Sequence, residues 1–288
     1  MTSTYKFHKV KSRLVLLVAI ELGPPLPTPE DDMSIYFDHT DVNARIVGGT
    51  VAPEGSHPHM VAMTNGVALR SFVCGGSIIA QRTVLTAAHC IAAVYSFGSL
   101  SNSLRVTIGT NRWNTGGVTL ALARNVTHPN YVSGTIKNDV GVLITSSPIS
   151  YSPSIQPITL TYENIGGGVP SRVAGWGRIV AGGALSATLL QLDANTLGGE
   201  ECRLAIEQAK IDFNQPNAPP VEPHIEICTF HSAGFGTCNG DSGSALARRS
   251  DNRQIGIVSW GFPCARGAPD MFVRVSGFAD FIQGNTVN

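Results

Sequence analysis

Short apolar or alternating stretches recur along most of the chain, separated by segments rich in Gly, Asn, Ser and Pro. Runs of this kind, bounded by turn residues, are typical of β-strands. The pattern therefore predicts an all-β barrel or sandwich in preference to a helical bundle. The clearest strand candidates are residues 77–79, 83–87, 104–108, 140–144, 172–174, 189–192 and 255–258.

The pattern changes near the C-terminus. Residues 275–283 place Phe278, Phe281 and Ile282 at the i, i+3, i+4 spacing of one helical face. We expect a short C-terminal helix that packs on the barrel.

The N-terminal part differs in composition from the rest. Lys6, Lys9, Lys11 and Arg13 precede the apolar run 14–20, as in the n- and h-regions of a signal peptide. The run is short, an acidic residue follows it, and no clear A-x-A cleavage site is present. It is far too short to cross a bilayer. The next stretch is proline-rich, acidic and without periodicity. We expect a candidate signal peptide at 1–22, a pro-segment at 23–45 and one folded domain at 46–288.

Charge and cysteine content narrow the function classes. The 20 basic and 20 acidic residues leave no formal net charge, which disfavours nucleic-acid binding. None of the six cysteines forms a C-x-x-C pair, which disfavours a zinc ribbon or a thioredoxin-type site. Their even number and wide spacing suit three disulfides in an oxidising compartment, whereas six free thiols in a cytosolic protein are the alternative. The cysteines are Cys74, Cys90, Cys202, Cys228, Cys238 and Cys264.

Three short motifs raise the question of nucleophilic catalysis. Ser242 lies in G-D-S-G, which suits either a nucleophile or a simple turn. His89, in A-A-H-C at the end of the predicted strand 83–87, is either a base or a half-buried structural histidine. Asp139, in N-D-V-G-V-L, opens a predicted strand, where a buried carboxylate is costly unless it is paired; a cap or strand-edge turn is the alternative.

Together and in the order His, Asp, Ser, these motifs resemble the trypsin/chymotrypsin-like serine proteases, over residues 46 to about 283. The resemblance implies an all-β fold of two packed six-stranded antiparallel Greek-key barrels with a short C-terminal helix. It implies that Ser242 attacks the scissile carbonyl, that His89 is the general base and that Asp139 orients His89.

The resemblance also implies roles for residues around the triad. The backbone N–H groups of Gly240 and Ser242 would form the oxyanion hole. Ser259 matches the serine that donates a hydrogen bond to the catalytic Asp. The implied disulfides are Cys74–Cys90, Cys202–Cys228 and Cys238–Cys264.

The stretch R-I-V-G-G at 45–49 resembles the activation site of the family. Cleavage after Arg45 would free the ammonium group of Ile46, which would then pair with Asp241 and order the active site. The alternative for these residues is an ordinary strand after a linker.

The expected specificity pocket is unusual. The position that forms its base in the family is Gly236, whereas trypsins have Asp there, and an acid, Asp270, lies on the adjacent wall. This pair resembles the broad-specificity serine collagenases of crustaceans and insects, and Gly261 matches an open pocket rim beside Trp260. We expect mixed specificity for basic and large apolar side chains. If Asp270 points away, specificity is chymotrypsin- or elastase-like.

The sequence departs from the family pattern at two places. Ser244 and Ala245 replace the usual Gly-Pro after G-D-S-G, and Gly141 lies in the strand that follows Asp139. Both changes leave the three motif residues in place, so we expect altered packing with the chemistry retained.

We expect no cofactor and no metal. The segment 111–125, where many trypsins bind calcium, contains no acidic residue. His57 and His59 are expected to lie on a surface turn, and Asn125 begins a glycosylation sequon.

The expected partners are a protein or peptide substrate, an activating protease and protein inhibitors, without nucleic acid or membrane. We expect a secreted monomer. A non-catalytic protease-like binding protein is the competing interpretation, although such relatives usually lose the Ser or the His, and both are present here.

Overall fold

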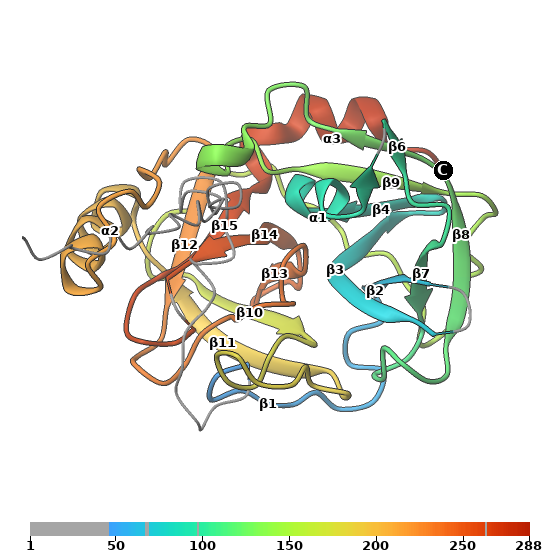
Figure 1. Ribbon diagram of the computed structural model, residues 1–288, viewed down its shortest axis with the longest axis horizontal. Helices are drawn as coiled ribbons and strands as arrows, with labels where there is room; N and C mark the ends of the chain where they lie inside the picture. Colours follow the sequence, from blue (N-terminus) through green and yellow to red (C-terminus); the bar gives the residue numbers. More distant parts are fainter. Residues whose placement is uncertain (1–45, 67–68, 97, 263) are drawn as a thin grey trace, which may run out of the picture.

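The computed structural model describes residues 46–288, except 67–68, 97 and 263. Two β-barrels lie side by side in it (Figure 1). The first is closed and antiparallel, with the strand order β2-β3-β4-β9-β8-β7. Its strands are β2 (Met60–Asn65), β3 (Ser71–Ala80), β4 (Thr83–Thr86), β7 (Leu104–Ile108), β8 (Val118–Thr127) and β9 (Gly141–Thr145).

The second barrel repeats this plan. Its strand order is β11-β10-β13-β14-β15-β12, and β12 pairs back onto β11 to close the ring. In both barrels the fourth strand returns beside the first, which is the Greek-key arrangement. The strands are β10 (Pro170–Gly175), β11 (Leu190–Thr196), β12 (Glu226–Phe230), β13 (Ala245–Arg248), β14 (Gln254–Gly261) and β15 (Asp270–Arg274), with the short β1 (Thr50–Val51) added beside β11. The predicted fold class is confirmed.

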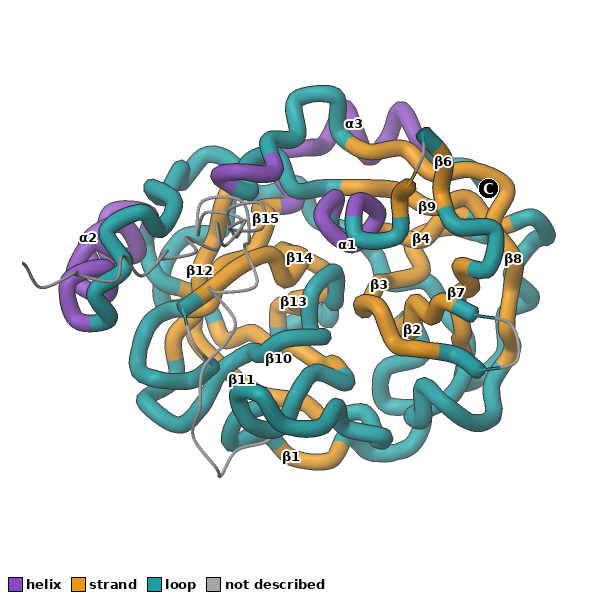
Figure 2. The backbone as a smooth tube through the Cα atoms, in the orientation of Figure 1, coloured by secondary structure: helices purple, strands orange, loops and turns teal. Residues whose placement is uncertain are grey.

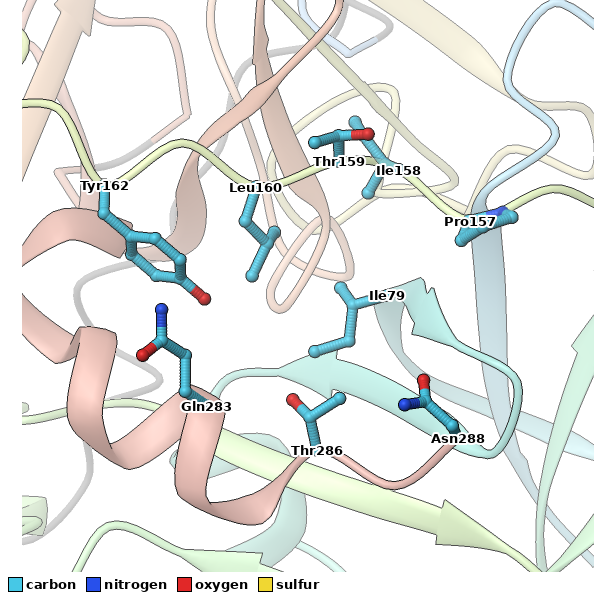
Figure 3. Close-up of a pocket in the computed structure, with 9 residues that line it drawn as sticks. All are labelled: Ile79, Pro157, Ile158, Thr159, Leu160, Tyr162, Gln283, Thr286 and Asn288. Atoms are coloured by element: carbon cyan, nitrogen blue, oxygen red, sulfur yellow. The ribbon is translucent and has the colours of Figure 1, made fainter.

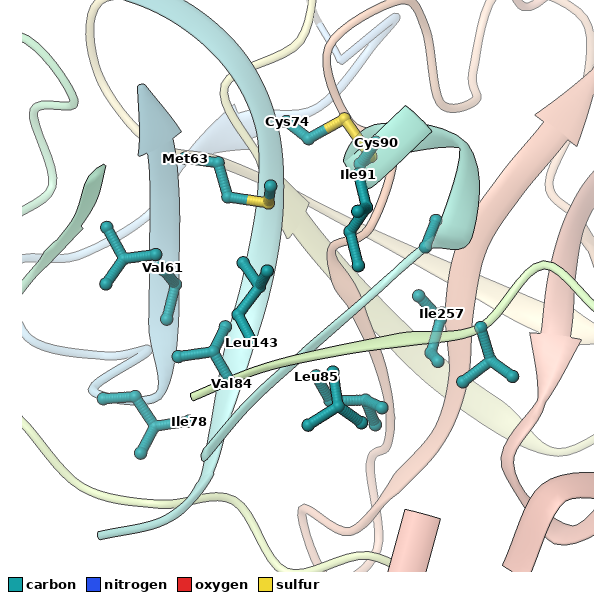
Figure 4. Close-up of a cluster of buried hydrophobic side chains, with 14 of the residues drawn as sticks. Val61, Met63, Cys74, Ile78, Val84, Leu85, Cys90, Ile91, Leu143 and Ile257 are labelled. Atoms are coloured by element: carbon teal, nitrogen blue, oxygen red, sulfur yellow. A yellow bond between two sulfur atoms is a disulfide. The ribbon is translucent and has the colours of Figure 1, made fainter. Parts of the chain in front are cut away.

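The apolar runs in the sequence form the core. Every residue of β4, β9 and β14 is buried, because these strands face packed side chains on both sides. Figure 4 shows part of the first core, in which Val61, Ile78 and Leu143 pack together near the Cys74–Cys90 disulfide. Ile257 from the second barrel joins the same cluster, so apolar packing is continuous between the barrels.

The C-terminal segment spans the two halves. The structure has a 3-10 helix, η3 (Val275–Phe278), followed by α3 (Ala279–Asn285), where the sequence predicted a single helix over 275–283. Phe278 and Ile282 enter the core of the first barrel. Beyond α3, the Val287 N–H donates to Thr83 Oγ1, which donates to the Val287 carbonyl.

The other helices were not predicted from the sequence. The expected strand 83–87 ends at Thr86, and His89 lies on the short helix α1 (Ala88–Ala92). The longer α2 (Gly199–Asp212) projects from the second barrel at the far left of Figure 2. The remaining elements are the small hairpin β5 (Tyr95–Ser96) and β6 (Ser99–Leu100) and the 3-10 turn η2 (Ser133–Thr135).

All six cysteines are paired, as Cys74–Cys90, Cys202–Cys228 and Cys238–Cys264. The pairing implied by the family resemblance is therefore confirmed. In the part of the chain that the structure describes, no helix has the length and apolar character needed to cross a membrane. The proposed signal peptide and pro-segment lie outside the described residues.

Candidate active site

His89 and Asp139 meet at the edge of the first barrel. Asp139 precedes β9 and its side chain is only 1% exposed. Its Oδ1 accepts a hydrogen bond from the His89 backbone N–H at 2.8 Å, and its Oδ2 contacts His89 Nδ1 at 2.8 Å. Because an ionised carboxylate only accepts hydrogen bonds, Nδ1 carries the proton. The other ring nitrogen, Nε2, is then left with a free lone pair.

The second barrel also contributes to this pair. Ser259 Oγ, on β14, donates to Asp139 Oδ2 at 2.6 Å. Burial by itself would lower the pKa of His89. The negative charge of Asp139 and its hydrogen bond to the ring outweigh burial and raise that pKa above its usual value. The carboxylate therefore fixes the orientation of His89 and strengthens it as a base.

Ser242 lies in the loop before β13, where the second barrel touches the first. The Gly75 N–H donates to the Ser242 carbonyl at 2.8 Å, and Cys74 is joined by its disulfide to Cys90, the neighbour of His89. These links bring Ser242 to the His89 side of the interface. Among the described residues no hydrogen bond joins Ser242 Oγ to His89, which agrees with the long catalytic contacts common in structures without substrate.

Glycines with positive φ lie on both sides of Ser242. Gly240 has φ +97°, and an added Cβ would lie 2.7 Å from the Leu185 side chain, so this position requires glycine. Within the described part of the chain, neither the Gly240 N–H nor the Ser242 N–H donates a hydrogen bond to a protein acceptor. Both donors are therefore free of protein acceptors in this part of the chain.

Asp241 is completely buried behind this loop. Its carboxylate accepts hydrogen bonds from the backbone N–H groups of Gly177 at 2.8 Å and Cys238 at 3.0 Å. Burial raises the pKa of Asp241 to about 7, although these two hydrogen bonds lower it. In the uncleaved chain this carboxylate has no cationic partner among the described residues. Ile46 is also completely buried, in the core of the second barrel.

The Asp270 carboxylate lies close to both glycines of the expected specificity pocket. Asp270 Oδ2 lies 3.0 Å from the position that a Cβ on Gly236 would occupy, and Oδ1 lies 3.9 Å from the equivalent position on Gly261. Thr237 holds the carboxylate in this position. Its backbone N–H donates to Oδ2 and its hydroxyl donates to Oδ1, both at 2.9 Å. The sequence analysis missed Thr237, because nothing in its local pattern indicates contact with a residue so far along the chain.

Burial raises the pKa of Asp270 to about 7, against the lowering effect of the two hydrogen bonds from Thr237; the charge of Asp241 adds a small further rise. The pocket acid is therefore easily neutralised. The indole of Trp260 is buried next to the pocket and only 1% exposed. The Cys238–Cys264 disulfide joins the segments on either side.

Two groups of residues that could suggest metal binding have other roles in the structure. Cys74, His89 and Cys90 lie close enough together to hold a metal, but both sulfurs are used in a disulfide. The expectation that His57 and His59 lie on a surface turn was wrong: His59 is buried, and His57 is half-buried and bonded to Gln191. Burial lowers the pKa of His59 to about 3, helped by His57, so His59 is neutral.

A hollow of about 490 Å³ lies away from these residues (Figure 3). It is lined by Ile79, by the connection between the barrels around Leu160 and Tyr162, and by Gln283 and Thr286 of the C-terminal segment. Its lining does not include His89, Asp139 or Ser242.

Two barrels with a His–Asp pair on one and a serine loop on the other define a chymotrypsin-like serine endopeptidase. Residues 46–282 match the Trypsin family. The chain is 36% identical to Chymotrypsin-2 of Vespa crabro, over 83% of this chain and 99% of that protein. It is 37% identical to Serine protease SP24D of Anopheles gambiae, over 83% of this chain and 80% of that protein. It is 31% identical to Trypsin alpha-4 of Lucilia cuprina, over 93% of this chain and 96% of that protein. The chain belongs to the trypsin family and is a serine endopeptidase.

Proposed function

We propose that this chain is a secreted endopeptidase, made as a zymogen, that cleaves after both basic and large apolar residues through an acyl-enzyme. Ser242 Oγ attacks the scissile carbonyl, and His89 Nε2 accepts its proton and then delivers it to the leaving amine. Asp139 stabilises the imidazolium. The Gly240 and Ser242 N–H groups stabilise the oxyanion. The two unpaired N–H groups and the oriented His89 support these roles.

The mixed specificity rests on one observation, the inward position of the Asp270 carboxylate beside Gly236. There it can pair with an Arg or Lys in the P1 position, the residue before the scissile bond. Thr237 donates one hydrogen bond to each oxygen of this carboxylate, which leaves each oxygen able to accept another from a basic side chain. When Asp270 is neutral, a large apolar side chain meets no buried charge.

The zymogen proposal rests on Asp241. A buried carboxylate is expensive without a cation, and its raised pKa expresses that cost. Cleavage after Arg45 creates an ammonium group on Ile46, which offers this partner. Gly175 and Gly177 lack a side chain where the Asp241 carboxylate lies, and a Cβ at either position would collide with it.

Secretion is supported by the three disulfides, because such bonds persist mainly in oxidising compartments. The partners of such a monomeric enzyme are an activating protease, protein substrates and protein inhibitors.

The test is cleavage after Arg45, followed by kcat/KM on matched peptides with Arg, Lys, Phe, Tyr, Leu or Ala at P1. We expect comparable values for Arg and for Phe or Leu, and loss of the Arg activity alone in Asp270→Gly. The Ser242→Ala protein, with Ile46 confirmed as its new N-terminus, is the control. Cleavage restricted to aromatic and aliphatic P1 residues contradicts the mixed pocket.

Chymotrypsin-like specificity is the second candidate, and the pKa of Asp270 favours it under acidic conditions. With a pKa of about 7, this acid is largely neutral below neutral pH. The pocket then presents no charge to attract a basic side chain.

A further inference from the structure

We propose that Lys137 and Glu226 form a buried positioning pair that holds Asp139 in register with the second barrel. Neither residue touches the reacting atoms. Lys137 precedes Asp139 by two positions on the first barrel, whereas Glu226 lies on β12 of the second. The inference goes beyond the proposed specificity and activation.

The pair is buried and fully hydrogen-bonded. Lys137 is 6% exposed, and its Nζ lies 2.7 Å from both carboxylate oxygens of Glu226 and 2.5 Å from the Pro220 carbonyl. The carboxylate also accepts a bond from the Glu222 N–H at 2.7 Å. A buried ion pair overcomes the loss of hydration only when its remaining donors and acceptors are satisfied in this way.

The same carboxylate reaches the strand that carries Ser259. Trp260 Nε1 donates to Glu226 Oε1 at 2.9 Å, and Lys137 Nζ lies 5.4 Å from the centre of the indole ring. Ser259, the next residue, donates to Asp139 Oδ2. A closed circuit therefore runs from Asp139 through Lys137, Glu226, Trp260 and Ser259 and back to Asp139. The Asp139 loop is tied to β14 at two points.

The backbone around Lys137 needs such a tie. Ile136 has φ +45° and Asn138 has φ +56°, so both neighbours of Lys137 are in the left-handed region. This conformation is unfavourable for a β-branched residue, and persists only when the surroundings impose it. The backbone bonds between Val132 and Lys137 close the turn, and the ion pair anchors its tip in the second barrel.

An ordinary stability role would be satisfied by an apolar pair of similar size. The polar circuit adds direction, because each bond fixes an orientation as well as a distance. We expect loss of the pair to move Asp139 relative to His89, and a misplacement of about 1 Å costs up to about 100-fold in rate.

The main test is the double variant Lys137→Met with Glu226→Gln. It removes both charges together, so that the local electrostatic balance is kept, and the Gln side-chain carbonyl can still accept from Trp260 Nε1. We expect it to fold and to lose roughly 10- to 100-fold in kcat with little change in KM. The acid limb of kcat/KM against pH should move to lower pH, because the pKa of His89 is raised through its contact with Asp139.

Three further measurements sharpen the result. Lys137→Met alone leaves Glu226 buried and unpaired, so it should lower the unfolding temperature more than the double variant does. Arg172→Met, which removes the partly exposed Arg172–Asp193 pair on the second barrel, is the control for loss of an ion pair elsewhere and should leave kcat unchanged. The proton NMR signal of the His89–Asp139 hydrogen bond, recorded on the uncleaved chain, should shift or broaden in the double variant. This last measurement does not depend on activation at Arg45.

A folded double variant with the parent kcat, the parent acid limb and an unchanged His89 proton signal would overturn the proposal. It would show that the pair contributes stability only.

Discussion

The position and pKa of Asp270 predict that P1 preference depends on pH. Because the pKa of the carboxyl in the empty pocket is about 7, about 9% of it is ionised at pH 6 and about 91% at pH 8. Only the ionised form attracts a basic P1 side chain. The ratio of kcat/KM for an Arg substrate to that for a matched Phe substrate should therefore rise about tenfold between pH 6 and pH 8.

The ratio isolates the pocket from the catalytic machinery. Both substrates use the same His89, so its titration affects both kcat/KM values equally and cancels. kcat/KM reports the free enzyme, so the relevant pKa is that of the empty pocket, before an Arg side chain has lowered it. The proposed pairing of Asp241 on activation would remove some negative charge near Asp270, but Asp241 is the smallest of the causes that shift this pKa.

The assay measures both substrates together in one competition mixture across the pH range. Asp270→Asn is the control, because it keeps the shape of the side chain and removes the titration. Its ratio should be low and independent of pH. A ratio that stays constant in the parent enzyme between pH 6 and pH 8 would refute the assignment of Asp270 as a titrating pocket acid.

Three other predictions concern the loop and its supports. Gly240→Ala puts a side chain on a residue with positive φ and displaces the proposed oxyanion donor. The rate in single-turnover assays should fall by about 10²–10³. A fall of less than tenfold would exclude Gly240 as a donor. Ser259→Ala removes the hydroxyl bond to Asp139 and should lower kcat about tenfold, measured beside KM, which should not change. Gly75→Ala collides with Ser244 and should cost about 1–3 kcal/mol in thermal unfolding, most of which is recovered when Ser244→Gly is added; equal losses in both backgrounds would contradict this contact.

The catalytic motifs and the strands were accessible from the sequence for related reasons. Both depend on residues close together in the chain: a small-residue approach to His89, an acid that opens an apolar strand, and glycines on both sides of Ser242. The predicted strand stretches are likewise local, and each lies on an observed strand or overshoots its end by one residue. Five barrel strands were not predicted: β2, β8, β12, β13 and β15.

Long-range and very short features could not be predicted. Helix α1 spans five residues, which is too few to show a helical period. Helix α2 is mostly polar, and its buried residues Cys202, Ile206 and Ala209 form a narrow stripe. The one local signal for its start was Glu201, an acid three residues after the N-cap Gly198. In the structure the Glu201 carboxylate accepts a hydrogen bond from the Gly198 N–H.

The closed circuit around Asp139 could not be predicted from the sequence either. Lys137 and Glu226 are ordinary charged residues in sequence, and only the packing of one barrel on the other brings them together. His59 was misplaced for a similar reason. Its neighbours are turn-forming residues, whereas its burial comes from contacts made by distant strands.

The segment after β15 links the C-terminal helix to the strand that leads to His89. The Ser242 loop lies later in the chain than His89 and Asp139. Val287 and Thr83 are joined by two hydrogen bonds. Phe278 and Ile282 fill the core beneath them. Fraying of α3 would therefore expose the core of the first barrel and leave the Thr83 hydroxyl, at the start of the strand that leads to His89, without its partner.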